Sequence, residues 1–212
     1  MRVIVGREQH ELGASELHAR LDGFERLAVD VGAGGGRAVL ASAATAPQTL
    51  VVGLDADAAS MVAASRRAAA SPSRGGRPNA MFVVGAAEDL PGPFERLADE
   101  VSVRFPWGSL LRGAIGEPGP VSRGLAAMVR AGGNLGLLLA LQPKDGFDDL
   151  LPLVSEPATL EARLRELYEP IGLQVRDCRW ATADEIAAAQ SSWARRLRVG
   201  GERQAVLARL TR

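Results

Sequence analysis

A glycine-rich segment at residues 30–36 has the spacing of a ligand-binding loop. Gly32, Gly34 and Gly36 occupy every second position directly after an apolar run and before a helical pattern. Glycine has no side chain, so a tight turn here lets backbone N–H groups approach a ligand closely. A dinucleotide-binding loop would read G-x-G-x-x-G, but its last glycine is replaced by Arg37. The pattern therefore indicates a cofactor loop of another kind.

Acidic residues follow at positions that suit a nucleoside cofactor. Asp55 ends the next apolar run, about 20 residues beyond the glycines, where an acid receives ribose hydroxyls. Ala87 and Glu88 follow the third run, in GAAEDLP, where they would flank an adenine ring. A nicotinamide enzyme is the main alternative, but it needs a separate catalytic group, and His10 and His18 both precede these elements.

Two tryptophans lie in segments that suit a flat substrate. Trp107 follows the fourth strand pattern in FPWGSLLRG, and Trp193 follows Ser192 in SSWARRLRVGGER. Taken singly, a tryptophan is more often a core residue than a ligand platform. Together, after predicted elements and beside glycine or arginine, they offer the two stacking faces that a flipped base requires. This pattern favours a base-modifying enzyme.

Positive charge is concentrated in two segments although the formal net charge is zero. Residues 190–212 contain six arginines and one acid, Glu202. A second basic area lies on the predicted second helix and the loop after it. Such areas suit a phosphate backbone, although arginine runs are more often solvated faces. The arginines that these two areas offer for RNA are Arg66, Arg67, Arg74, Arg77, Arg195, Arg196, Arg198 and Arg203.

Alternating strand and helix patterns place these segments on one α/β domain spanning residues 1–212. Strands are predicted at 26–31, 49–55, 80–86, 99–105 and 134–141, with helices at 37–44, 58–70, 121–130 and 158–168. This order predicts a mostly parallel sheet with its ligands at the carboxyl ends of the strands.

Both ends of the chain depart from the parallel pattern. Residues 173–180 and 203–210 alternate apolar with polar, as an antiparallel hairpin at a sheet edge does. Between them, Thr182 and Glu185 form a capping box for a helix over 183–190. Residues 2–12 are predicted to form a short N-terminal hairpin.

Composition excludes several classes of protein. One cysteine and two histidines are too few for a disulfide framework or for a zinc site of the Cys/His type, so no metal is expected. The longest apolar runs fall short of the roughly 18 residues that a membrane helix needs. We therefore expect a soluble, cytoplasmic protein without membrane contact, and a monomer, because no long apolar stripe suggests a partner subunit.

The glycine spacing from Asp30 resembles the first motif of class I methyltransferases, which implies a Rossmann-like sheet and S-adenosylmethionine as cofactor. Five segments, DVGAGGGR, VVGLDA, AAEDLP, FPWGSLLRG and SSWARRL, together resemble the aminoglycoside-resistance methyltransferases that modify N1 of adenine 1408 in 16S rRNA. The last two are specific to that group. Gly35 departs from the pattern, because relatives often carry a polar or acidic residue there.

The resemblance implies a role for each segment. Asp30, Gly32, Asp55, Ala87 and Glu88 would contact the cofactor, with Gly34 and Gly36 in the same loop. Trp107 and Trp193 would sandwich the flipped adenine, and Ser192 would line that pocket. The surface that docks on the 30S subunit would include Arg66, Arg67, Arg196 and Arg203.

The implied chemistry needs few titratable groups, because adenine N1 already presents a lone pair to the methyl sulfonium. Catalysis would rest on alignment of donor and base. Two further methyltransferase classes remain as alternatives: enzymes acting on guanine N7 of transfer RNA, which fit WGSLLR poorly, and enzymes acting on small molecules, which need no arginine-rich end. A non-catalytic RNA-binding protein with the same fold is a third.

Overall fold

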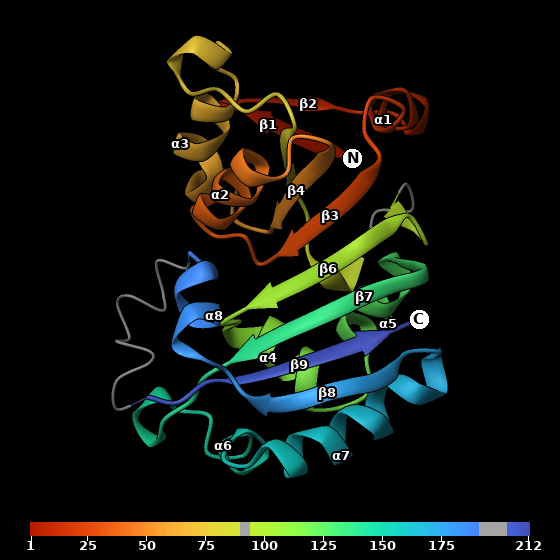
Figure 1. Cartoon of the computed structure of the whole chain (residues 1–212), viewed down its shortest axis with the longest axis vertical. Coiled ribbons are helices and arrows are strands. Elements are labelled where there is room, and N and C mark those ends of the chain that lie inside the picture. The colour runs from red at the N-terminus through yellow and green to blue at the C-terminus, as the bar shows by residue number, and fades with distance from the viewer. Residues whose placement is uncertain (90–93, 191–202) are drawn as a thin grey trace.

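The computed structural model describes residues 1–89, 94–190 and 203–212, and one sheet runs through them (Figure 1). Its strands are Arg2–Val5 (β1), Glu8–Glu11 (β2), Arg26–Val31 (β3), Thr49–Asp55 (β4), Ala80–Val84 (β5), Ala98–Arg104 (β6), Val129–Leu139 (β7), Gln174–Trp180 (β8) and Val206–Thr211 (β9). Their order is β2-β1-β5-β4-β3-β6-β7-β9-β8. The five neighbouring strands β5, β4, β3, β6 and β7 pair in parallel, and the remaining pairs are antiparallel.

Helices pack on both faces of this sheet, but they cover the two faces unequally. They are Ala14–Leu21 (α1), Arg37–Thr45 (α2), Ala58–Ala68 (α3), Gly108–Ile115 (α4), Pro120–Met128 (α5), Leu151–Val154 (α6), Pro157–Tyr168 (α7) and Ala183–Ala188 (α8). One apolar cluster joins the sheet to α2 and α3, and a larger one joins the opposite face to α1, α4, α5 and α7. Around β4 and β5 the sheet is therefore the middle of three layers, whereas the α2–α3 face of β6 and β7 carries exposed residues such as Glu100 and Asn134.

Strand β4 shows why these sequences form buried parallel strands. Leu50, Val52 and Leu54 point to the larger cluster, while Val51 points to the smaller one. Because side chains alternate between faces, a strand covered by helices on both sides must be apolar at successive positions. At Gly53 a β-carbon would lie 2.8 Å from Cγ2 of Val39, so this site must stay small for α2 to pack.

The predicted α/β architecture is confirmed, including the N-terminal hairpin β1–β2 and the antiparallel C-terminal pair β8–β9. The pair lies at the sheet edge with β9 inside, between β7 and β8. Helices α1 and α4 were not predicted. Each is eight residues long and begins after a residue that offers no side-chain acceptor, Gly13 and Trp107 respectively, so the usual Ser, Thr, Asp or Asn start signal is missing.

Gly36 and Gly35 provide a matched test of the packing behind the glycine loop. At Gly36, where φ is 67°, a β-carbon would lie 2.5 Å from Cε1 of Phe82 and 2.7 Å from Cβ of Ala64. At the neighbouring Gly35 it would meet nothing within 4 Å. We expect Gly36→Ala to lower the free energy of unfolding by about 2–4 kcal/mol through overpacking and left-handed strain. Gly35→Ala should change it by less than about 1 kcal/mol.

Urea unfolding of both variants measures this difference. Equal unfolding free energies for the two alanine variants would show that the close contacts at Gly36 do not constrain the fold.

Candidate active site

A pocket lies at the carboxyl ends of β3, β4, β5 and β6, where an open α/β sheet places its ligands. Most of the residues predicted for the cofactor line it. They are Asp30, Gly32, Gly34, Asp55, Ala87 and Glu88, and Trp107 joins them from the loop after β6. Gly36 does not line the pocket, because it begins α2 and faces Phe82 behind the loop.

The glycine loop takes a shape that other residues adopt only with strain. Gly32 and Gly34 have φ angles of 75° and 50°, in the left-handed region that favours glycine. A β-carbon on Gly32 would lie 2.6 Å from Cδ2 of Leu110, whereas Gly34 faces open space. The Gly34 N–H donates to Oδ2 of Asp55 at 2.7 Å, and Oγ of Ser60 donates to the Gly34 carbonyl at 3.0 Å. These bonds hold the loop against the ends of β4 and α3.

Asp55 links the loop to the strand that carries it. Its Oδ1 accepts from the Asp57 N–H at 2.8 Å, while Oδ2 accepts from Gly34. An ionised carboxylate has about four acceptor sites, so each oxygen retains capacity for a further donor such as a hydroxyl. Asp55 is half-buried and lines the pocket. The residue can therefore shape the loop and accept from a ligand at the same time.

An ion pair between a buried carboxylate and a half-buried arginine forms one wall of the pocket, and its basic member was not predicted. Arg104, the last residue of β6, lies with Nη1 3.0 Å from Oδ1 of Asp30, which also accepts from Oγ of Ser102 at 3.0 Å. Burial raises the pKa of Asp30, while the charge of Arg104 and the Ser102 hydrogen bond oppose the rise. The sequence signal for this partner was the position of Arg104 near the end of a predicted strand. The structure pairs that strand, β6, with β3, which carries Asp30.

Trp107 lies at the rim of the pocket, where another aromatic ring packs against it. It precedes α4, is 38% exposed, and packs edge-to-face on Phe147 with ring centroids 4.8 Å apart. The guanidinium of Arg112 lies 5.2 Å from the centroid of that phenylalanine ring and forms a 2.5 Å ion pair with Asp149. Before Trp107, Phe105 takes a left-handed φ of 50°. Strain of this kind persists where the surrounding structure enforces it, commonly near functional sites.

Several predicted residues lie outside the described part of the chain. These are Ser192, Trp193, Arg195, Arg196 and Arg198. The residues just before them, Ala189 and Gln190, line the pocket. The roles expected of the five therefore remain predictions.

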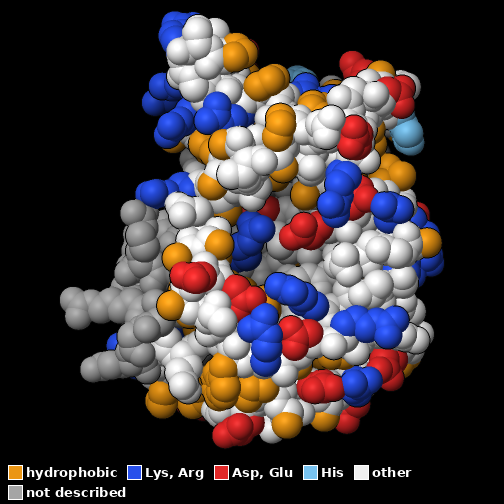
Figure 2. Space-filling model, in the orientation of Figure 1, with side chains coloured by type: hydrophobic (Ala, Val, Ile, Leu, Met, Phe, Trp, Pro, Cys, Tyr) orange, Lys and Arg blue, Asp and Glu red, His pale blue; other side chains and the backbone are white. Residues whose placement is uncertain are grey.

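The basic area on α3 is exposed as expected. Arg66 and Arg67 end this helix on the surface, Arg74 is exposed in the following turn, and Arg77 is half-buried. Figure 2 shows basic side chains gathered over this part of the molecule. The described residues place no carboxylate within ion-pair distance of Arg66 or Arg67.

The expected surface position of Arg203 is wrong. Its side chain is 1% exposed and pairs with both carboxylate oxygens of Asp145, while Nη2 also donates to Oε1 of Gln142 at 3.1 Å. A fork of N–H donors matches a carboxylate well enough to be buried with it. Arg203 thereby ties the start of the last strand segment to the turn after β7.

The expectations about metal ions and membrane helices can be examined in the described residues. Within residues 1–89, 94–190 and 203–212, no three His, Cys, Asp or Glu side chains are grouped so that they could hold a metal ion. In the same residues, each helix is too short or too polar to span a bilayer.

Comparison with known proteins identifies the group to which this arrangement belongs. Residues 2–211 match the NpmA family, described as 16S rRNA (adenine(1408)-N(1))-methyltransferase. The protein of that name from Streptoalloteichus hindustanus is 38% identical over 98% of this chain and 97% of its own length. The one from Escherichia coli is 26% identical over 96% and 94% respectively.

Solved structures agree with the sequence match. The crystal structure of the 16S rRNA (adenine(1408)-N(1))-methyltransferase from Catenulisporales acidiphilia has a TM-score of 0.87 and 33% identity, covering 99% of this chain and 97% of that one. The 16S rRNA methyltransferase KamB has a TM-score of 0.86 and 32% identity over the whole of both chains. The chain belongs to the NpmA family of 16S rRNA (adenine(1408)-N(1))-methyltransferases.

Proposed function

We propose that this protein transfers a methyl group from S-adenosylmethionine to N1 of adenine 1408 in the 16S rRNA of the small ribosomal subunit, and thereby confers aminoglycoside resistance. One observation carries the proposal: the family match runs from residue 2 to residue 211, and the same chain brings the glycine loop, Asp55 and Trp107 together around one pocket.

The pocket residues fit the cofactor. The backbone of Gly34 faces open space, and Asp55 at the end of β4 retains acceptor capacity for ribose hydroxyls. Ala87 and Glu88 line the side formed by the loop after β5, where an adenine ring would lie. A relative from Catenulisporales acidiphilia, 32% identical, was crystallised with S-adenosylmethionine as cosubstrate. When bound, this cofactor supplies an electrophilic methyl group.

The chain's own groups make a base-free transfer reasonable. Adenine N1 carries a lone pair and loses no proton before it attacks. Cys178, the sole cysteine, is not a plausible nucleophile, because burial raises its thiol pKa to about 12 and its Sγ donates to the Pro157 carbonyl. The protein's task is therefore to hold the two reactants in line and to exclude water.

Aromatic faces would hold the adenine. Trp107 is partly exposed at the pocket rim and is supported from behind by Phe147. We propose that it forms one side of a sandwich, with Trp193 as the other side and Ser192 beside it. Stacking on two rings also favours the cationic adenine that forms when N1 is methylated.

Docking on the subunit would use exposed arginines. Arg66 and Arg67 offer two guanidinium groups to the rRNA backbone, and Arg195, Arg196 and Arg198 are proposed to add to this contact. Two alternatives are not favoured: methylation of guanine N7 in transfer RNA and methylation of a small molecule. The family match and the relatives' named substrate both favour ribosomal RNA.

We also propose that the protein acts as a monomer in the bacterial cytoplasm. Among the described residues only three large apolar side chains are prominently exposed, Val5, Trp107 and Trp180. They are too few to form the apolar patch that an obligate dimer would require.

The central prediction concerns the modified nucleotide. Small subunits incubated with the protein and labelled S-adenosylmethionine should gain label in 16S rRNA. Primer extension should then stop at position 1408, because N1 methylation blocks Watson–Crick pairing. A label in RNA without a stop at 1408 would contradict the assigned target, and no label in RNA would contradict the assigned substrate.

Replacement of the tryptophans tests the stacking model. We expect Trp107→Ala and Trp193→Ala each to lower the turnover number about ten- to a hundredfold, since stacking contributes about 1–3 kcal/mol per base. Cofactor affinity measured by calorimetry should change less than turnover, and thermal unfolding should show that both variants fold. Wild-type turnover in both folded variants would exclude the sandwich.

Charge removal on α3 tests the docking surface. The double variant Arg66→Ala/Arg67→Ala should bind small subunits more weakly, with a salt dependence shallower by roughly 1.5–2 in the log–log slope. Arg123→Ala is a suitable control, because this arginine is exposed on α5, against the opposite face of the sheet. A control variant with the same loss of affinity as the double variant would rule out a specific role for α3.

A further inference from the structure

The third tryptophan, Trp180, is exposed at the same edge of the sheet as the pocket. It is the last residue of β8 and is 37% exposed. Trp180 pairs with Val206 of β9, and Val206 pairs with Leu139 of β7. The neighbouring Leu138 pairs with Arg104 of β6, the residue that lines the pocket. One row of residues across the sheet therefore joins the pocket wall to Trp180.

The register also sets the separation between the two sites. From β6 to β8 there are three steps between neighbouring strands, through β7 and β9. At about 4.8 Å per step, Trp180 lies roughly 14 Å along the sheet edge from the strand that leads to Trp107. A ribosomal RNA bound at the pocket is large enough to contact Trp180 as well.

The backbone around Trp180 is held firmly. Arg179 donates to both carboxylate oxygens of Glu185, at 2.9 and 2.7 Å, and to the Trp180 carbonyl at 3.1 Å. The hydrogen bond from Arg179 and that from the Thr182 N–H lower the pKa of Glu185 to about 2, so the carboxylate is charged at neutral pH. The Ala181 N–H donates to the Ala205 carbonyl at 2.8 Å.

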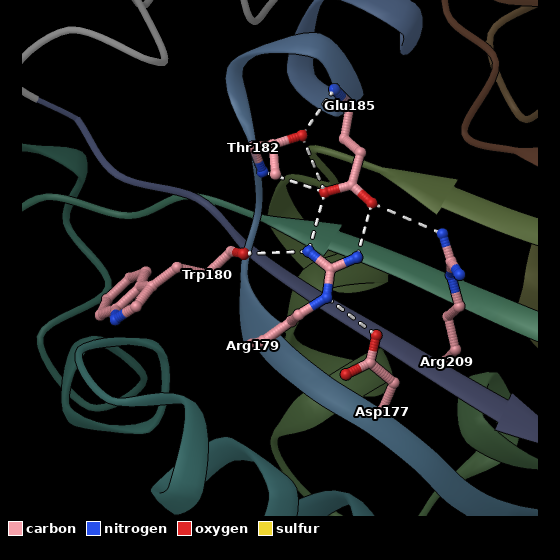
Figure 3. A network of polar contacts seen from close by, with 6 residues as sticks. All are labelled: Asp177, Arg179, Trp180, Thr182, Glu185 and Arg209. Atoms are coloured by element: carbon pink, nitrogen blue, oxygen red, sulfur yellow. Dashed lines mark hydrogen bonds and ion pairs between the residues drawn. The ribbon is translucent and has the colours of Figure 1, made fainter.

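The indole itself points away from this network (Figure 3). It forms one wall of a small hollow whose other sides are mainly apolar, from Ala181, Ala183, Ile186 and Ala205, with Gln204 and Arg203 also in the lining. A large apolar ring that stays partly exposed contributes less to stability than a fully buried one would. The combination of a fixed backbone and an exposed ring is typical of a contact made with a partner.

The surroundings favour RNA as that partner. Helix α8 begins three residues after Trp180, and the residues that follow it, Ala189 and Gln190, line the pocket. The connection from there to Arg203 carries Arg195, Arg196 and Arg198 in the sequence. Trp180 is therefore exposed at the sheet edge where the target base must enter, and an exposed aromatic ring there offers a stacking face to an unpaired nucleotide.

We propose that Trp180 stacks on an unpaired nucleotide of the 16S rRNA outside the target site while the flipped adenine occupies the pocket at Trp107. This proposal rests on the proposed function. Trp180 is then a substrate-binding residue for the ribosomal subunit and takes no part in the methyl transfer.

Two single replacements separate aromatic stacking from apolar packing. Trp180→Leu keeps an apolar side chain against the hollow but removes the ring, and Trp180→Phe keeps an aromatic face. We expect the leucine variant to raise the KM for small subunits about 5- to 100-fold, with kcat and cofactor affinity unchanged. The phenylalanine variant should stay within about threefold of the wild type.

A leucine variant with the wild-type KM, or a phenylalanine variant impaired to the same extent as the leucine variant, would overturn the stacking role. Thermal unfolding and cofactor binding establish that both variants are folded. A wild-type protein that fails to methylate the subunit at all would instead refute the proposed function, so the two failures are distinguishable.

Cross-linking identifies the chemistry of the partner. With p-benzoylphenylalanine at position 180, irradiation of the complex with small subunits should join the protein to 16S rRNA. A cross-link to a ribosomal protein in place of RNA would contradict the proposal.

Discussion

The central strands β4, β3, β6 and β7 are paired on both sides, and one face of them packs on the larger apolar cluster. Their backbone groups are satisfied within the sheet, and the side chains on the packed face are apolar, whereas the other face also carries polar residues such as Glu100 and Ser102 of β6. Because these strands are parallel, their carboxyl ends meet at one edge. Asp30, Asp55 and Arg104 therefore lie around the same pocket although each ends a different segment of the sequence.

Arginine–carboxylate pairs fix the sheet where its interior meets solvent. Asp30 pairs with Arg104 at the pocket, and Asp99 accepts from Arg130 and from the Leu27 N–H at the opposite strand ends. Partial burial would raise the pKa of Asp99, but these donors hold it below the usual value, so the carboxylate stays ionised. Removal of the arginine would leave an unpaired, poorly solvated carboxylate charge. Such a charge destabilises the folded state more than the paired charges do.

The parts of the fold that follow from local pattern could be predicted from the sequence. The alternation of strands with helices, the glycine loop and Asp55 depend on neighbours in the chain or on the general geometry of a parallel sheet. Phe147, which braces Trp107 from a segment 40 positions later, leaves no local signal. Arg203 looked like a surface arginine for the same reason, because Asp145 lies 58 positions away. Contacts of this kind depend on how distant segments meet.

Although the net charge is zero, some arginines pair with carboxylates and others do not. On the side of α7 and β8, Arg163, Arg165 and Arg179 pair with Glu166, Glu161, Glu169, Asp177 and Glu185. In the described residues these pairs neutralise acidic side chains on that side of the molecule. Arg66 and Arg67 on α3, by contrast, are exposed and have no such partners among the described residues. A polyanion responds to the local field within about 10 Å and not to the sum over the molecule. An rRNA-binding surface is therefore compatible with a neutral chain, and overall charge was a poor guide to the partner.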